Sequence, residues 1–155
     1  MTENPGAAQG PRPSAFITAP PRIVVFLCVH NSSRSQMAEA FARAQAPEGT
    51  EVWSAGTEPR EVHPMAREVM QEIGIDLAAH RSKNVSEVPL DRADTVVLVC
   101  GEQEASCPRV QGTVRKVHWP LPDPTVAPEP ERLEAFRRIR DDIKWRISSL
   151  WPQGD

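Results

Sequence analysis

Cys28 and Arg34 are separated by five residues in a segment that directly follows the apolar run 23–27. The segment reads Cys28-Val29-His30-Asn31-Ser32-Ser33-Arg34-Ser35. A loop of this kind between a buried strand and a helix can bind a tetrahedral oxyanion, because its amides, the donor fork of arginine and the positive end of the helix all favour negative charge. The same field favours a thiolate, so the segment predicts that Cys28 is a nucleophile.

A cysteine at the end of an apolar strand is more often a small buried hydrophobic residue than a nucleophile. The context of Cys28 favours the catalytic interpretation, because the spacing to Arg34, the strand pattern before it and the helical pattern after it occur together. We therefore predict an oxyanion-binding loop. Its binding residues are Val29, His30, Asn31, Ser32, Ser33, Arg34 and Ser35.

The elements that must position this loop alternate along the chain. Short apolar runs predict strands at 23–27, 51–55, 94–99 and, more weakly, 115–118. Helical patterns cover 35–46, 63–73 and 129–150. The alternation predicts an α/β fold with a doubly wound, four-stranded parallel sheet flanked by helices. Ligands of such sheets bind beyond the carboxyl ends of the strands, where Cys28 and Cys100 both fall.

Length and charge limit the class of protein. A chain of 155 residues corresponds to one domain, which we expect over 22–151 after a disordered leader at 1–21. The net charge of −3 and the lack of a long basic run argue against nucleic-acid binding. Basic and acidic residues alternate in the last helix, so we expect a solvated face there.

Targeting signals and cysteine usage give two further expectations. No apolar run is long enough to cross a bilayer and the first residues lack a signal-peptide pattern, so we expect a cytoplasmic protein with no membrane partner. The three cysteines are an odd number for a secreted disulfide scaffold, and none has zinc-ligand spacing. Nucleophilic or redox chemistry, without a metal, is the better interpretation.

The loop 119–124, Trp-Pro-Leu-Pro-Asp-Pro, presents one carboxylate on a stiff segment. An Asp-Pro pair is usually only a turn. A thiolate that displaces an oxygen leaving group needs a proton donor on the opposite side, however, and Asp123 is the best candidate for that acid.

Cys100 and Cys107 flank a polar segment. One interpretation makes Cys100 a core residue and Cys107 an incidental surface thiol. If a short helix held both, the sulfurs would lie about 10 Å apart. A disulfide needs Cα atoms within about 7 Å, so the segment would have to unwind, as a dithiol relay with a mobile linker would do.

These residues carry a family resemblance. The loop 28–35, the continuation Gln36-Met37-Ala38-Glu39, the segment Trp53-Ser54-Ala55-Gly56-Thr57 and the pair Asp123-Pro124 resemble the low-molecular-weight tyrosine phosphatase superfamily. Within it, Cys100 and Cys107 and their separations from Cys28 resemble the thioredoxin-coupled arsenate reductases. The resemblance covers about residues 23–150.

The resemblance implies a reaction sequence. The Cys28 thiolate attacks the arsenic of loop-bound arsenate while Asp123 protonates the departing hydroxide. Cys100 then attacks Cys28 and arsenite leaves, and Cys107 attacks Cys100 to form a disulfide that thioredoxin reduces. The resemblance implies no bound cofactor, arsenate and thioredoxin as partners, and we expect a monomer.

Two departures from the family pattern bear on this expectation. Many relatives have glycine at the position of His30, whereas this loop contains no glycine, so Asn31 must supply any left-handed backbone conformation. The His-Asn loop also resembles a branch of reductases that uses the external thiol mycothiol. Retention of Cys100 and Cys107 favours thioredoxin.

Support beneath the loop is implied by the same resemblance. Some of these reductases hold a potassium ion through residues that match Asn31, Glu39, Ser54 and an acid, and Lys83 stands at the position of the acid. Our hypothesis is that the Lys83 ammonium supplies the positive charge, so that activity does not depend on potassium.

Two other classes of function stay open. As a hydrolase, the same loop and Asp123 would cleave a phosphotyrosine ester, with water in place of Cys100 as second nucleophile. The chain has no Tyr and only four Phe and four Trp to contact a tyrosyl ring, although Trp119 could serve. A non-catalytic oxyanion or arsenical sensor is the third class, and it would have no need of Asp123.

Overall fold

The computed structural model describes residues 20–101, 110, 112 and 114–151. Four strands form one parallel sheet in the order β2-β1-β3-β4. Their bounds are Ile23–Cys28 (β1), Glu51–Gly56 (β2), Thr95–Leu98 (β3) and Arg115–His118 (β4). The predicted four-stranded parallel sheet is confirmed. Most of the expected leader 1–21 lies outside the described residues.

Strand β1 is apolar because both faces of the sheet are covered along it. Side chains of β1 alternate between two clusters, with Phe26 and Cys28 in the larger one and Val25 and Leu27 in the smaller. All four side chains are buried. The continuous apolar run that predicted this strand thus reflects packing on both sides rather than one solvated face.

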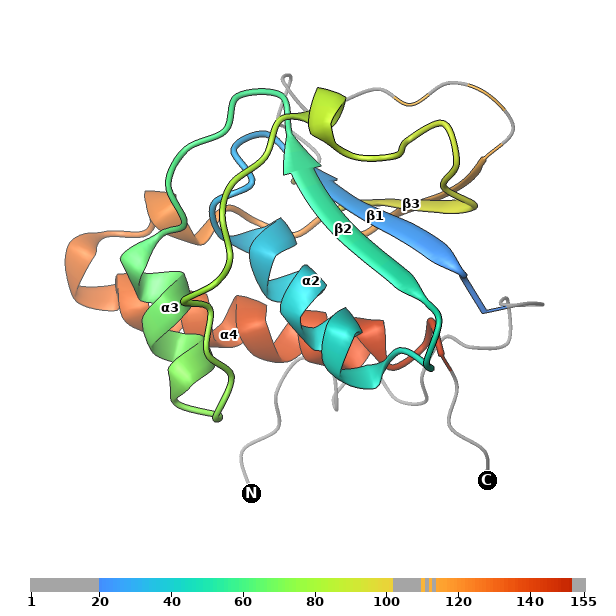
Figure 1. Ribbon diagram of the computed structural model, residues 1–155. Coiled ribbons are helices and arrows are strands. Elements are labelled where there is room, and N and C mark those ends of the chain that lie inside the picture. Colours follow the sequence, from blue (N-terminus) through green and yellow to red (C-terminus); the bar gives the residue numbers. More distant parts are fainter. Residues whose placement is uncertain (1–19, 102–109, 111, 113, 152–155) are drawn as a thin grey trace.

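Three helices cover the face with the larger cluster, and Figure 1 shows them together on one side of the sheet, with the short 3₁₀ helix η2 on the other. Their bounds are Arg34–Gln45 (α2), Pro64–Gln71 (α3) and Glu129–Ile147 (α4). The 3₁₀ helices are Val85–Glu87 (η2) and Pro124–Val126 (η3). Within the described residues, no helix is long and apolar enough to cross a membrane.

The helix ends differ slightly from the predicted ones. We expected α3 to continue to Ile73, but it ends at Gln71, because the chain turns through Gly74 at φ 83° and Ile75 N donates to Met70 O. This positive φ at a glycine just after a helix is the usual way to satisfy its last carbonyls. The last helix likewise stops at Ile147 instead of continuing to Leu150.

The expectation of a fully solvated polar face on α4 is wrong for Arg140. This side chain is only 8% exposed, and its Nη1 donates to Val69 O and to Glu72. Arg137 also pairs with Glu72, although it is more exposed. Two arginines of α4 therefore fasten that helix to the end of α3, a role that alternating charges in the sequence do not reveal.

The order of the strands places the carboxyl ends of β1 and β3 side by side. Leu27 pairs with Leu98, and Val99 N donates to Leu27 O, so the chain that leaves β3 runs beside the end of β1. β1 lies between β2 and β3, which is the point where the strand order reverses and where ligands of such sheets bind. Cys28 is the last residue of β1 at this edge.

Candidate active site

The loop after β1 turns all its carbonyl groups outward. Carbonyl oxygens of five successive residues, 29–33, accept hydrogen bonds from groups outside the loop 28–35. In chain order their donors are Glu58 N, Arg60 N, Gln36 Nε2 with Ser82 Oγ, His63 N and Met37 N. The C=O and the following N–H of a trans peptide point in opposite directions. The amides of 30–34 therefore face the inside of the loop, as an oxyanion site requires.

The thiol of Cys28 lies at the bottom of this ring of amides. Asn31 N donates to Cys28 Sγ at 3.3 Å, which shows directly that one loop amide points inward. Cys28 is a free thiol and only 2% exposed. Asn31 has φ 49°, so the left-handed conformation expected of it is present.

A directed chain of hydrogen bonds leads from the thiol into the protein. Asn31 Nδ2 can only donate, and it gives one hydrogen to Ser35 Oγ (2.7 Å) and one to Ser54 Oγ (2.9 Å). Each hydroxyl then has its own hydrogen left to donate. Ser35 Oγ lies 2.9 Å from Cys28 Sγ, and Ser54 Oγ donates to Glu39 Oε1 at 2.5 Å. The Ser35 hydroxyl is thereby set to donate to a thiolate, which stabilises that form.

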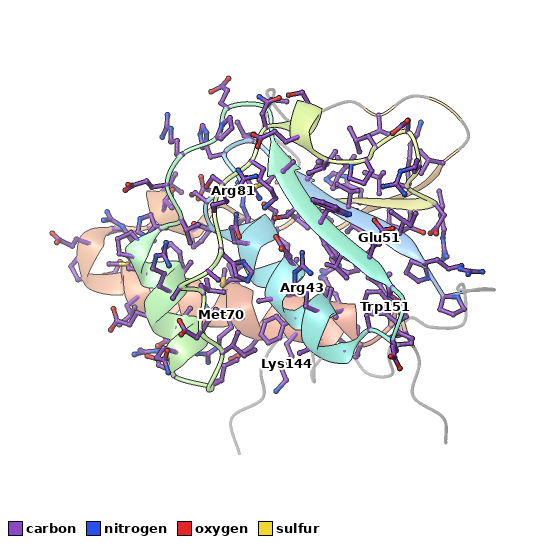
Figure 2. The ribbon with its side chains drawn as sticks, viewed as in Figure 1. Arg43, Glu51, Met70, Arg81, Lys144 and Trp151 are labelled. Carbon is purple, nitrogen blue, oxygen red and sulfur yellow. The ribbon has the colours of Figure 1, made fainter. Side chains whose placement is uncertain are left out.

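Glu39 is a buried carboxylate held by two cations. Its Oε2 accepts from Arg43 Nε at 2.9 Å, and its Oε1 lies 3.6 Å from Lys83 Nζ. Burial lowers the pKa of Lys83, and the nearby Glu39 opposes that shift. The structure thus brings Asn31, Glu39, Ser54 and Lys83 together beneath the loop. Figure 2 labels Arg43 and Arg81, which line a second pocket next to this cluster.

Gln36 is a further support residue that sequence reasoning missed. Its Nε2 donates to three oxygens: Asn31 O, Asn31 Oδ1 and Arg81 O, each at 3.0 Å. This fixes its Oε1 toward His80 Nδ1 at 2.8 Å, so His80 donates through Nδ1. Burial lowers the pKa of His80, with Glu39 opposing.

Gly56 leaves the space that the loop needs. A Cβ at this position would lie 2.5 Å from Val29 O and 2.9 Å from Asn31 N, both backbone atoms. Gly56 pairs with Cys28 in the β1–β2 register. The glycine that ends β2 is therefore required by the close approach of the loop and not by an unusual φ.

Arg34 and Asp123 lie next to each other at the mouth of the loop. Arg34 is 4% exposed, its Nη1 donates to Leu121 O at 2.9 Å, and its Nη2 lies 3.9 Å from Asp123 Oδ2. Asp123 is the N-cap residue of η3, and its Oδ1 accepts from Thr125 N (2.9 Å) and Thr125 Oγ1 (2.7 Å). With Oδ1 committed to Thr125, Oδ2 is the oxygen that can carry a proton for transfer.

Sequence reasoning also missed Thr125 as a site residue. A signal was present, because Asp followed two residues later by Thr is a pattern in which a side chain caps a turn.

A pocket of about 330 Å³ opens above the thiol. Its lining combines the predicted residues Cys28, His30, Ser32, Ser33, Arg34 and Asp123 with four others, Arg60, Glu61, His63 and Thr125. His30 Nδ1 lies 2.9 Å from Glu58 O. No Phe, Trp or Tyr is among these described lining residues. The pocket has room for a tetrahedral anion, and its lining side chains are mainly polar or charged.

Trp119 does not line this pocket. It is 6% exposed and lies against Phe26, with ring centroids 6.3 Å apart. The idea that it contacts a substrate ring is therefore wrong, because the indole belongs to the core under the sheet.

Cys100 is completely buried and shares the larger apolar cluster with Cys28. Adjacent parallel strands lie about 5 Å apart, so two residues that leave neighbouring strands toward the same face start close together. Cys100 is disulfide-bonded, and its carbonyl lies 3.0 Å from His118 Nε2. Cys107 lies outside the described residues, so its predicted role stays a prediction.

Within the described part of the chain, no three His, Cys, Asp or Glu side chains gather in a way that could hold a metal ion. The cradle of inward amides around Cys28, with a buried arginine and a carboxylic acid at its mouth, suits an anion instead.

The profile of a family described as low molecular weight phosphotyrosine protein phosphatase matches residues 23–153. This chain belongs to that family. The family resemblance inferred from the loop and the Asp-Pro pair is thereby confirmed. The match extends over the whole described sheet and its three helices.

Several relatives of this chain are named as arsenate reductases, and phosphatases are also among the solved structures that it resembles. One from Halalkalibacterium halodurans is 38% identical over 135 residues, which are 86% of this chain and 97% of the relative. A solved arsenate reductase in the phosphate binding state is 35% identical, with a TM-score of 0.71, and the match covers 83% of this chain and 95% of that one. A thioredoxin-dependent arsenate reductase from Corynebacterium glutamicum is 28% identical, with a TM-score of 0.61, over 88% of this chain and 65% of that one.

Proposed function

We propose that this chain is an arsenate reductase that uses thioredoxin as electron donor. The observation that carries the proposal is the pair of buried cysteines at one sheet edge. Cys28 lies inside an oxyanion cradle, and Cys100 follows the neighbouring strand on the same face. The names of the relatives, which are arsenate reductases, support the choice of arsenate among tetrahedral oxyanions.

The first step is an attack by the thiolate. Arsenate sits on the inward amides of the loop beside Arg34, and Cys28 Sγ forms a bond to arsenic. An arsenate oxygen leaves as water after Asp123 Oδ2 gives up its proton. Ser35 donates a hydrogen bond to the sulfur until the bond to arsenic has formed.

The second and third steps move two electrons to arsenic. Cys100 sulfur attacks Cys28 sulfur, the sulfur–arsenic bond breaks with its electron pair on arsenic, and arsenite leaves with a Cys28–Cys100 disulfide behind it. Cys107 then attacks Cys100, which frees Cys28 as a thiolate. The dithiol of thioredoxin reduces the Cys100–Cys107 disulfide and becomes oxidised itself.

The electron donor is the finer part of this proposal. A thioredoxin-dependent reductase is among the structural relatives, which supports thioredoxin. Mycothiol, the small-thiol alternative, would attack the arsenic adduct directly and would need neither Cys100 nor Cys107. The three-thiol relay requires a reducing compartment, and the proposal therefore includes a cytoplasmic location. The proposal also takes the enzyme to be a monomer.

Ester hydrolysis is the second candidate function, and the family as a whole supports it. The pocket argues against a phosphotyrosine substrate, because the described lining residues include no Phe, Trp or Tyr that could contact a tyrosyl ring. The burial of Trp119 removes the one aromatic candidate that the sequence suggested.

The test is a single turnover without any added reductant. Fully reduced protein is mixed with arsenate, the released arsenite is quantified, and the disulfides are mapped by mass spectrometry. We expect one equivalent of arsenite and a Cys100–Cys107 disulfide. Arsenite that forms only after a small thiol is added would move the chain to the mycothiol-type branch, and a lack of arsenite under both conditions would favour the phosphatase.

The variant Cys100→Ser separates the two candidate reactions. It should abolish arsenite release and leave hydrolysis of p-nitrophenyl phosphate intact, because only the redox step uses the second thiol. Cys28→Ser is the matched control and should abolish both reactions.

A further inference from the structure

His63 lines the pocket above the thiol, and the mechanism above gives it no role. It precedes Pro64, the first residue of α3, and caps that helix by accepting from Met65 N through Nδ1 at 3.0 Å. Its backbone N donates to Ser32 O at 2.9 Å, so it also contacts the oxyanion loop. The ring packs against Phe136 with centroids 4.9 Å apart. These contacts leave the imidazole little freedom to rotate.

The cap decides which ring nitrogen of His63 carries the hydrogen. A backbone N–H can only donate, so Nδ1 must present its lone pair to Met65 N and the hydrogen must sit on Nε2. Protonation at Nδ1 would place two donors against each other. Burial lowers the pKa of His63, the positive charge of Arg132 lowers it further, and Asp123 opposes the shift. The ring is therefore neutral near neutral pH.

The Nε2–H group of His63 has no hydrogen-bond partner among the described residues. Among the described residues, the hydrogen bonds of His63 side-chain atoms are accounted for by the contact to Met65, and no buried side-chain nitrogen or oxygen there lacks a partner. Nε2 is therefore accessible rather than buried. His63 lines the pocket together with Cys28, Arg34 and Asp123, and it also lines a neighbouring pocket with Arg67 and His80. An accessible N–H donor of this residue is therefore available at the wall of the oxyanion pocket.

We propose that His63 Nε2–H donates a hydrogen bond to an oxygen of the tetrahedral oxyanion in this pocket, and so serves as a binding residue alongside the loop amides and Arg34. This inference rests on the proposed function only in taking the pocket as an oxyanion site. A neutral donor adds a contact without adding charge, and it requires an oxygen that presents a lone pair. The contact therefore favours arsenate or phosphate in a form whose oxygen next to His63 is unprotonated.

The test separates the Nε2 contact from the helix cap. In His63→Asn the side-chain oxygen still caps α3, since asparagine is a good N-cap residue, but the side chain is too short to replace Nε2. His63→Ala loses both. Glu68→Gln, an exposed change on the same helix, is the matched control. The probe is inorganic phosphate, and its affinity is measured from the protection of Cys28 against iodoacetamide.

We expect phosphate to bind about 3- to 10-fold more weakly to both His63 variants, as the loss of one hydrogen bond predicts. Glu68→Gln should bind like the wild type. With arsenate, KM should rise by a similar factor in His63→Asn while kcat changes little. If His63→Asn binds phosphate as tightly as the wild type and only His63→Ala is impaired, the histidine is a cap and the proposal is overturned.

The phosphate assay does not depend on arsenate reduction, so the two proposals fail separately. Phosphate binding that depends on His63, in a protein that never releases arsenite, would leave this inference standing and overturn the reductase. A wild-type protein in which phosphate does not protect Cys28 would overturn this inference, whatever its reductase activity.

Discussion

Ser35 Oγ lies 2.9 Å from Cys28 Sγ and has one hydrogen to give, because the same oxygen already accepts from Asn31 Nδ2. The orientation of that hydroxyl is therefore set by Asn31 and not by the thiol. Asn31 is fixed in turn by Ser54, Gln36 and the backbone of Lys83. The environment of the Cys28 thiol depends in this way on a network that extends beneath the loop to Gln36, Ser54 and Lys83.

Ser35→Ala should slow the reaction at the thiol. The variant loses a hydrogen bond to a charged sulfur, which is typically worth about 1.5–3 kcal/mol, so the rate of Cys28 alkylation by iodoacetamide at neutral pH should fall by about 10-fold or more. Ser86→Ala, an exposed change within η2, is the control. An unchanged alkylation rate in Ser35→Ala would show that the hydroxyl does not stabilise the thiolate.

Gly56→Ala should damage the loop rather than the sheet. The added Cβ would meet Val29 O at 2.5 Å, so the loop must shift, and we expect a loss of about 1–3 kcal/mol in the free energy of unfolding together with weaker phosphate binding. Gly49→Ala is the comparison, since Gly49 has φ 93° and no atom near its missing Cβ. It should cost stability through backbone strain alone and leave phosphate binding unchanged.

The fold and the loop around Cys28 could be predicted from sequence because they depend on local signals. The continuous apolar run before Cys28 fixes a strand covered on both faces, and the spacing to Arg34 fixes the loop. The roles of Thr125, His63 and Gln36 depend on contacts between segments far apart in the chain, such as Gln36 with Arg81. Trp119 was a wrong candidate for contact with a substrate ring for the same reason, because its burial against Phe26 depends on tertiary packing.

Stability should fall in mild acid because of His80. Burial lowers its pKa below the ordinary value of 6.5, so below pH 6.5 the unfolded chain takes up a proton that the folded chain resists, and the free energy of unfolding decreases until the pKa of the folded state is passed. Urea unfolding between pH 7.5 and 5 measures this. The variant His80→Gln, which can still donate to Gln36, should show a smaller decrease over that range.

His63 should contribute to the same decrease, since its pKa is lowered as well. The double variant with His63→Asn should therefore have a flatter profile than His80→Gln alone. A wild-type profile that stays flat from pH 7.5 to 5 would contradict the assignment of both rings as neutral groups.

Potassium should not change the activity of the wild-type protein. The Lys83 ammonium lies 3.6 Å from Glu39 Oε1 and already provides a positive charge beneath the loop. Arsenate turnover is compared in sodium and potassium salts at equal ionic strength, and a clear gain in potassium would argue against this role. Lys83→Met should lower the free energy of unfolding by about 1–3 kcal/mol. This loss is smaller than that of fully breaking a buried ion pair, because Arg43 still faces Glu39. Lys116→Met on exposed β4 is the control.

Asp123→Asn should remove the proton donor and preserve the architecture around it. The amide oxygen can still accept from Thr125 N and Oγ1, so η3 and the neighbouring Arg34 should keep their places, while no proton can pass from the second position to the leaving oxygen. General acid catalysis is typically worth about 10²- to 10⁴-fold, and kcat for arsenate should fall within that range with phosphate binding retained. Thr125→Val removes only the Oγ1 contact and should reduce kcat by about 3- to 10-fold. Equal losses in the two variants would mean that Asp123 acts by holding the loop, and full activity of Asp123→Asn would mean that another group is the acid.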